Sequence, residues 1–350
     1  MKNRKRIISA LIMAAILLSV SYFAYAAGVT KNIEVAYTGV SIYVEGKLID
    51  PRDANGNPVE PFIYEGTTYL PVRAISEALG KPVDWNAQAN RIDIDDPNRE
   101  TKVVTVKTAE EFIAALNSDT HILMEPGTYN LSSASISPRA NVVWDSVFDG
   151  RELHLDRIKN LTIEGKGATP VNIVIEPRYA FVLNFTRCES ISIKNITAGH
   201  TDDGYCQGGV FAFSDSKNIS IDSVNMYGCG TEGLRLLRVQ DMSVADSSVY
   251  ECTYSIMTVE QSEDIAFYNC IFRDNEQFSL VNIISTDDLL FSHCQFNNNK
   301  SNSTFFEVQA STDIEVFESS FEGNTAKQLH YPGSIINLLE TCTFTNNNFE

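Results

Sequence analysis

A short stretch of the chain, residues 198–209 with the sequence AGHTDDGYCQGG, gathers side chains that could move protons. His200, Asp202, Asp203 and Tyr205 fall within six residues of one another. Histidine titrates near neutral pH, and a pair of carboxyl groups can serve as general acid and general base. A solvated loop with an Asx turn would also explain the aspartates, and an exposed turn would explain the histidine.

A second stretch, residues 228–235 with the sequence GCGTEGLR, adds a carboxylate and a cation. The candidate catalytic residues are therefore His200, Asp202, Asp203, Glu232 and Arg235. Further polar residues at related positions are candidate ligand-binding residues: Tyr205, Arg238, Glu260, Asn282 and Glu307. For Arg235 and Glu260, an ordinary pair on a strand surface is an alternative explanation. We expect no metal site, because His200, Asp202 and Cys206 match no standard ligand spacing.

A repeat of about two dozen residues must position these groups. Similar apolar runs begin at Ile191, Ile219, Met242, Ile265, Leu289 and Ile314, at intervals of 28, 23, 23, 24 and 25 residues. Each unit contains short alternating strands separated by polar turns, and only the unit with the 198–209 insert is longer. Insertions in repeat proteins form loops on one face, which is often the functional face.

Like residues recur at equivalent positions of the repeat. Ten residues after the run starts come Cys229, Cys252, Asn275, Asn299 and Asn324, and Asn347 continues this series. A second series contains Cys270, Cys294 and Cys342. Parallel strands stacked about 4.8 Å apart would place identical side chains over one another, so the asparagines could hydrogen-bond in a ladder. We expect the cysteines to be buried packing thiols, since a Cys229–Cys252 disulfide would be strained.

The repeat resembles the right-handed parallel β-helix superfamily, which includes pectate lyases and polygalacturonases, over about residues 103–350. The predicted fold class is therefore mainly β, with the solenoid at residues 101–350. A helix from the capping box at Thr108–Glu111 is expected to cover its open end. The resemblance implies a protein that engages extracellular polysaccharide, as a binding or structural module.

A polysaccharide lyase or glycoside hydrolase, with its site at residues 198–209 and 228–235, is the alternative. The polygalacturonase signatures Asn-Thr-Asp, Gly-His-Gly and Arg-Ile-Lys are missing, and no pectate-lyase calcium cluster is present. We expect no cofactor, with Ca²⁺ needed only if the protein is a lyase. Trp144, Asp145, Phe148 and Asp149 form another possible sugar-stacking patch, although packing over the first coils would also explain Trp144.

The front of the chain carries two further segments. Residues 28–98 contain VSIYVEGKLI and TTYLPVRAISEALGKPVDWNAQANRIDI, which resemble the copper-amine-oxidase N-terminal-like (stalk) module. This segment has no His or Cys, so we expect a small α+β appendage without copper chemistry. Residues 1–26 have a basic start, an apolar run and Ala24-Tyr25-Ala26, typical of a signal peptide.

Charge narrows the choice of partner. The chain has 27 Lys and Arg against 45 Asp and Glu, a formal net charge of −18. Such acidity argues against nucleic-acid binding, and it disfavours an anionic glycan unless a local basic cluster or a cation intervenes. We therefore expect a secreted or cell-envelope protein that partners a polysaccharide, with no membrane contact after signal cleavage. The oligomeric state is left open by the sequence.

Overall fold

The computed structural model describes residues 33–349, except residues 45, 54–55, 82, 87–90, 95–100, 136, 138, 202–207, 229, 231, 333–335 and 339–340. The chain divides into two compact units, residues 1–98 and 99–350. In the described part of the chain, no helix is long and apolar enough to cross a membrane.

The first unit is a small α+β module. Three antiparallel pairs flank one helix, α2 (Val72–Ala78): β1 (Ile42–Val44) with β2 (Lys47–Ile49), β3 (Phe62–Tyr64) with β4 (Thr67–Tyr69), and β5 (Val83–Asn86) with β6 (Arg91–Ile94). Gly46 and Gly66 supply the positive φ angles of two of the tight turns. The predicted small α+β module is therefore confirmed.

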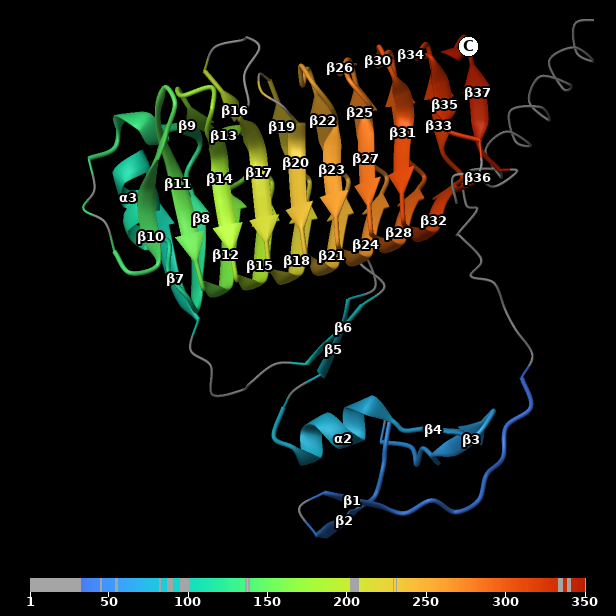
Figure 1. Ribbon diagram of the computed structural model, residues 1–350. Coiled ribbons are helices and arrows are strands. Elements are labelled where there is room, and N and C mark those ends of the chain that lie inside the picture. The colour runs from blue at the N-terminus through green and yellow to red at the C-terminus, as the bar shows by residue number, and fades with distance from the viewer. Residues whose placement is uncertain are drawn as a thin grey trace, which may run out of the picture. The chain divides into compact units, whose positions relative to one another are not determined.

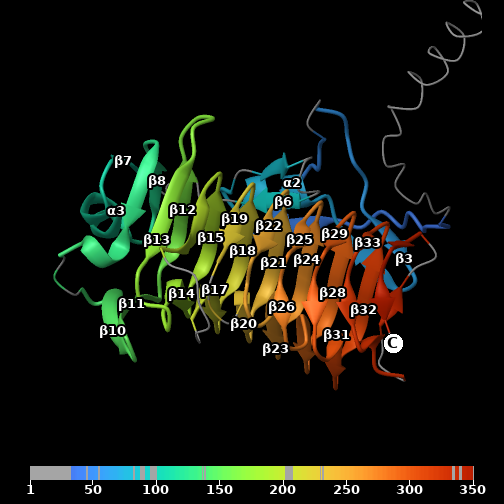
Figure 2. The same ribbon diagram turned by 90° about the horizontal axis from the view of Figure 1, so that it is seen from above.

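The second unit is a coil of strands in three long sheets, in which neighbouring strands are parallel except for the antiparallel pair β10–β11 (Figures 1 and 2). The first sheet contains β10 (Val142–Val147), β11 (Gly150–Asp156), β14 (Phe181–Thr186), β17 (Gly209–Ser214), β20 (Glu232–Leu237), β23 (Met257–Glu260), β27 (Val281–Ile284), β31 (Thr304–Gln309) and β35 (Gln328–His330). The second contains β7 (Lys102–Val106), β8 (Thr120–Met124), β12 (Lys159–Gly165), β15 (Glu189–Lys194), β18 (Lys217–Asp222), β21 (Gln240–Ala245), β24 (Glu263–Tyr268), β28 (Asp287–Ser292), β32 (Thr312–Phe317) and β36 (Asn337–Leu338).

The third sheet contains β9 (Gly127–Asn130), β13 (Val171–Ile175), β16 (Thr197–His200), β19 (Asn225–Tyr227), β22 (Ser248–Tyr250), β25 (Ile271–Arg273), β29 (Gln295–Asn297), β33 (Ser320–Glu322) and β37 (Thr343–Thr345). A short fourth sheet, β26 (Glu276–Gln277), β30 (Lys300–Ser301), β34 (Thr325–Ala326) and β38 (Asn348–Phe349), joins the last turns. Each turn of the coil, here called a rung, stacks in register on the next. The predicted solenoid is confirmed.

Side-chain ladders inside the coil hold the rungs together. Asn299 donates its side-chain amide to Oδ1 of Asn324 at 3.0 Å, and Asn324 repeats this with Asn347 at 2.9 Å. Each asparagine oxygen also accepts the backbone N–H of the asparagine one rung before. These bonds satisfy buried polar groups at a bend. The predicted asparagine ladder is therefore confirmed.

Aromatic and thiol side chains fill the rest of the interior. Phe296 stacks on Phe321 with ring centroids 4.7 Å apart, and the exposed Phe344 continues this stack on Phe321 at the same distance. Cys252, Cys270 and Cys294 are buried free thiols, as predicted. Cys206 and Cys229 lie outside the described residues. Repetition of one rung geometry makes like residues pack on like residues.

A short helix closes the start of the coil. At the start of α3 (Ala109–Ala115), the Thr108 hydroxyl accepts a hydrogen bond from the backbone N–H of Glu111. The Glu111 carboxylate in turn accepts one from the backbone N–H of Lys107. Phe112 and Ile113 are buried against the first strands and against η1 (Leu131–Ser133). The capping box and the covering role of this helix are as expected.

Candidate functional site

The described part of the 198–209 insert brings one predicted residue into the coil. His200, the last residue of β16, is only 3% exposed, and its Nε2 donates to the carbonyl of Ala180 at 2.9 Å. Its Nδ1 is buried without a partner, and burial lowers the pKa of the imidazole. Asp202, Asp203 and Tyr205 lie outside the described residues.

Glu232 and Arg235 form an ion pair at the start of β20. Glu232 is 1% exposed, and its Oε1 lies 2.5 Å from Nε of Arg235 without an aligned hydrogen bond. Burial raises the pKa of the Glu232 carboxyl, and the Arg235 charge opposes that rise. The Arg235 guanidinium also lies over the Phe181 ring, 5.3 Å from its centroid. A buried carboxyl with a raised pKa is suited to donate a proton, but this one is covered.

These groups do not converge in the described part of the chain. No hydrogen bond or ion pair there joins His200 to Glu232 or Arg235. Arg238 turns to the other edge of the first sheet, where it binds Asp215 through two bonds of 2.5 and 2.9 Å. The structure thus separates the predicted residues into three local arrangements.

The remaining predicted ligand residues lie on the outer face of the first sheet. Arg235, Thr258, Asn282 and Glu307 follow one another in register over successive rungs. The Asn282 amide donates to the Ser279 carbonyl at 3.2 Å, and Glu307 accepts from the Ser279 hydroxyl at 3.3 Å. Glu260 stands on the same face beside Ile284 in the next column. This column offers hydrogen-bonding groups along the coil.

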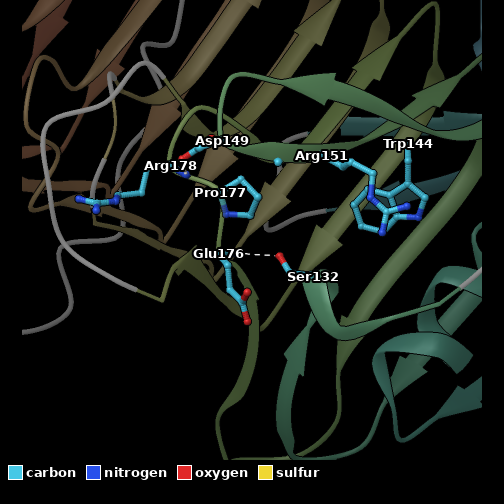
Figure 3. Close-up of a pocket in the computed structure, with 8 residues that line it drawn as sticks. Ser132, Trp144, Asp149, Arg151, Glu176, Pro177 and Arg178 are labelled. Atoms are coloured by element: carbon cyan, nitrogen blue, oxygen red, sulfur yellow. Dashed lines mark hydrogen bonds between the residues drawn. The ribbon is translucent and has the colours of Figure 1, made fainter.

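A more open site lies earlier in the chain, at the antiparallel hairpin of β10 and β11. We call it the hairpin pocket. Its cavity of about 410 Å³ is lined by Ser132, Trp144, Asp149, Gly150, Arg151, Glu176, Pro177 and Arg178 (Figure 3). Two of the lining side chains are acidic and two are basic, so the pocket is polar without a net charge.

The Asp149 carboxylate fixes the hairpin tip to the segment before β14. It accepts the backbone N–H groups of Arg178 at 2.7 Å and Tyr179 at 3.2 Å. The next residue must be small, because a Cβ on Gly150 would lie 2.5 Å from Cγ of Pro177. On the floor of the pocket, the backbone N–H of Glu176 donates to Ser132 Oγ at 2.9 Å. The pocket is therefore held together by bonds from the Asp149 and Ser132 side chains to backbone N–H groups.

Aromatic rings stand beside this pocket. Phe148, at the hairpin tip, is 86% exposed, and its ring centroid lies 5.0 Å from that of Tyr179. Trp144 instead packs partly against the core, and Arg151 lies over its ring at 5.0 Å. The sequence suggested a patch of Trp144, Asp145, Phe148 and Asp149. Of these four residues, Phe148 is the one whose aromatic ring is largely exposed to solvent.

Asp145 has a different role from its predicted neighbours. Its Oδ2 lies 2.6 Å from Nδ1 of His154, whose Nε2 contacts the Thr186 hydroxyl at 2.9 Å. The sequence did not reveal these partners, nor Glu176, Arg178 and Tyr179, because all of them lie before Ile191, where the recognisable repeat begins. Within the described residues, no group of three or more His, Cys, Asp or Glu side chains could hold a metal ion.

The three stacked sheets define a parallel β-helix, and comparison with known families agrees. Residues 181–349 match the family described as the right handed beta helix region, and residues 53–126 match the copper amine oxidase N-terminal domain. The second match runs past residue 98 into the first rungs. The chain is thus a right-handed parallel β-helix repeat protein with an N-terminal module of the copper-amine-oxidase N-terminal-like type.

The chain is also similar to several solved structures at low sequence identity. A pectate lyase from Bacillus sp. N165 in complex with trigalacturonate is 12% identical, with a TM-score of 0.49 over 71% of this chain and 82% of that one. A pectate lyase variant from Xanthomonas campestris is 11% identical, with a TM-score of 0.49 over 77% of this chain and 84% of that one. An alginate lyase from Paenibacillus sp. str. FPU-7 is 11% identical, with a TM-score of 0.42 over 71% of this chain and 99% of that one. No curated protein sequence matches the chain.

Proposed function

We propose that this is an exported β-helix protein that binds extracellular polysaccharide at the hairpin pocket, as a binding or structural module. The observation that carries the proposal is the exposed Phe148 ring, held beside Tyr179 and a polar cavity of about 410 Å³. The apolar face of a sugar ring packs on an aromatic ring, while its hydroxyl groups need donors and acceptors nearby.

The charged groups of the pocket suit hydroxyl recognition. Glu176 already accepts from the Asn130 side chain at 2.8 Å and retains further acceptor capacity. Arg151 supplies N–H donors from a guanidinium that lies over the Trp144 ring. An exposed Phe at a hairpin tip leaves apolar surface in water, and a ligand that covers it recovers that loss.

Affinity electrophoresis through gels that contain soluble plant and cell-wall polysaccharides tests this proposal. Phe148→Ala should weaken retention about tenfold, because covering part of one aromatic ring contributes about 1–2 kcal/mol. Tyr268→Ala is the matched control, since Tyr268 is an exposed aromatic residue on the second sheet. Equal retention of wild type and Phe148→Ala on every retained polysaccharide would remove this site from the proposal.

A lyase or hydrolase remains the second candidate function, and one feature favours it. The Glu232 carboxyl is buried beside Arg235 and burial raises its pKa, so it is the candidate general acid for a leaving oxygen. The same polysaccharides, incubated with wild type and Glu232→Gln in the presence and absence of Ca²⁺, should show no new reducing ends and no unsaturated products. Product formation that Glu232→Gln abolishes would establish the enzyme instead.

A further inference from the structure

A carboxylate, an imidazole and a hydroxyl are hydrogen-bonded in series on the first sheet. Asp145 lies on β10, His154 on β11 and Thr186 on β14, which are neighbouring strands. Nδ1 of His154 lies 2.6 Å from Oδ2 of Asp145, and its Nε2 lies 2.9 Å from the Thr186 hydroxyl oxygen. Leu153 and Leu155 are completely buried, so the alternation of β11 turns His154 away from the core. We call Asp145, His154 and Thr186 the outer triad.

The two bonds fix the proton positions in the outer triad. As a carboxylate, Asp145 only accepts hydrogen bonds, so Nδ1 of His154 carries the ring proton and Nε2 keeps its lone pair. The Thr186 hydroxyl therefore donates to Nε2. In this arrangement a histidine can take the proton of a hydroxyl nucleophile while a carboxylate holds the imidazole in place.

Cationic groups stand beside the hydroxyl. Asp156 is in register with Thr186 on the preceding rung, and its carboxylate binds two guanidinium groups. Nε and Nη2 of Arg187 donate to its Oδ1 at 2.8 and 2.6 Å, and Nη2 of Arg157 lies 2.7 Å from its Oδ2. A guanidinium has five N–H donors, more than these bonds use, so both groups can stabilise negative charge that develops near Thr186.

We infer that the outer triad hydrolyses acyl esters, with the O-acyl groups of a polysaccharide as its substrate class. Oγ1 of Thr186 forms a bond to the acyl carbon while its proton passes to Nε2 of His154. The bond from the acyl carbon to the sugar oxygen then breaks, and His154 gives the proton to that oxygen. Water next attacks the acyl carbon and gives a proton to His154, which returns it to the departing Thr186 oxygen. The products are the sugar hydroxyl and a carboxylic acid, and water is the co-reactant.

The surroundings of the outer triad favour an ester on a large substrate. An alkoxide leaves more readily than an amide nitrogen, which suits a weak hydroxyl nucleophile. The Asp145 side chain is 52% exposed and Thr186 is half-buried, so an acyl group that projects from a polymer can reach the hydroxyl. Phe148 follows Asp145 by three residues on the same hairpin. The polysaccharide in this inference rests on the proposed function, whereas the hydrolysis does not.

A second series of the same kind provides a matched control. Nδ1 of His293 lies 2.8 Å from the Ser292 hydroxyl, and its Nε2 lies 2.6 Å from Oε2 of Glu318. Ser292 is only 7% exposed, so the protein covers the hydroxyl that a substrate would have to reach. His293 thus reports the background reactivity of a surface imidazole.

Hydrolysis of p-nitrophenyl acetate by the full-length protein, with mass spectrometry of the quenched reaction, tests the outer triad. Wild type should carry one acetyl group, which peptide mapping should place on Thr186, and Thr186→Ser should form the same ester. Thr186→Val should form none, and His154→Gln should lower kcat about 100-fold through loss of the general base. Asp145 is a positioning residue, so Asp145→Asn should lower kcat at least about tenfold with KM unchanged. His293→Gln should leave kcat unchanged.

Acetate release from acetylated xylan and other O-acetylated polysaccharides tests the substrate class. Phe148→Ala should raise KM for these polymers and leave hydrolysis of p-nitrophenyl acetate unchanged, which separates this inference from the hairpin pocket. Acetylation of another residue, or equal rates for wild type and Thr186→Val, would overturn the outer triad while the hairpin pocket stands. Hydrolysis of p-nitrophenyl acetate without acetate release from any polymer would overturn the polysaccharide as substrate.

Discussion

Removing one member of the asparagine ladder should destabilise the coil far more than removing an exposed asparagine. Asn299 is completely buried and lies between Asn275 and Asn324. We consider Asn299→Ala, which deletes the amide without adding volume. The variant leaves the backbone trace of the rung unchanged, so the expected loss comes from groups that lose their partners.

The magnitude follows from the bonds that are deleted. Oδ1 of Asn299 accepts the backbone N–H of Asn275 at 3.1 Å and its side-chain amide at 2.9 Å. Nδ2 of Asn299 donates to the Phe272 carbonyl at 2.9 Å. A buried polar group left without its partner costs about 1–3 kcal/mol. With the Asn275 N–H and the Phe272 carbonyl both affected, the free energy of unfolding should fall by about 3–5 kcal/mol.

Urea unfolding followed by far-ultraviolet circular dichroism measures this difference. Asn302→Ala is the matched control, because Asn302 is exposed and its backbone N–H, which bonds Gln277, is retained. The control should change stability by less than about 0.5 kcal/mol. A loss below about 1 kcal/mol for Asn299→Ala would refute the ladder as a source of stability.

Three further perturbations test other parts of the fold. Burial lowers the pKa of His200 below 6.5, so near that pH the unfolded chain binds a proton that the folded chain excludes. The free energy of unfolding should therefore fall as the pH drops through 6.5. In urea titrations, His200→Gln should flatten this pH dependence. Iodoacetamide should leave Cys188 and Cys252 unlabelled in the native protein and label both in urea. The reason is that burial raises the pKa of both thiols, that of Cys188 to about 11. Labelling of the native protein, detected by peptide mass spectrometry, would contradict their packing. Gly209→Ala should lower the thermal midpoint, because its Cβ would lie 2.3 Å from the Phe181 ring, whereas Gly167→Ala has open space and should show only the smaller effect of its positive φ.

The coil could be predicted from the sequence because its geometry repeats. A spacing of 23 to 25 residues places Asn275, Asn299 and Asn324 on one column, and the structure bonds them as that spacing requires. The same alignment placed Arg235, Thr258, Asn282 and Glu307 on one outward column, which the strand register confirms. Parallel stacking in register leaves few alternatives once the period is known.

The hairpin pocket could be predicted only in part, because it lies where the repeat is not yet regular. β10 runs antiparallel to β11, so Phe148 and Asp149 have no counterparts in later rungs. Their partners, Arg178 and Tyr179, lie about thirty residues away in a segment between strands. No period relates the two segments, and the contact depends on Gly150, whose need is visible only against Pro177.

The contrast between the two polar sites explains why binding is the stronger proposal. In β17, Gly209 and Ala212 have little or no side chain at the positions in register with Glu232 and Arg235. Arg235 can therefore lean back across that rung to Phe181, and it covers the carboxyl whose pKa burial has raised. A ligand would have to separate Arg235 from Glu232 to reach the carboxylate. Leaving that buried carboxylate without its partner would cost several kcal/mol. At the hairpin pocket the backbone of Arg178 and Tyr179 is already fixed by Asp149, and the exposed Phe148 ring needs no rearrangement to receive a sugar.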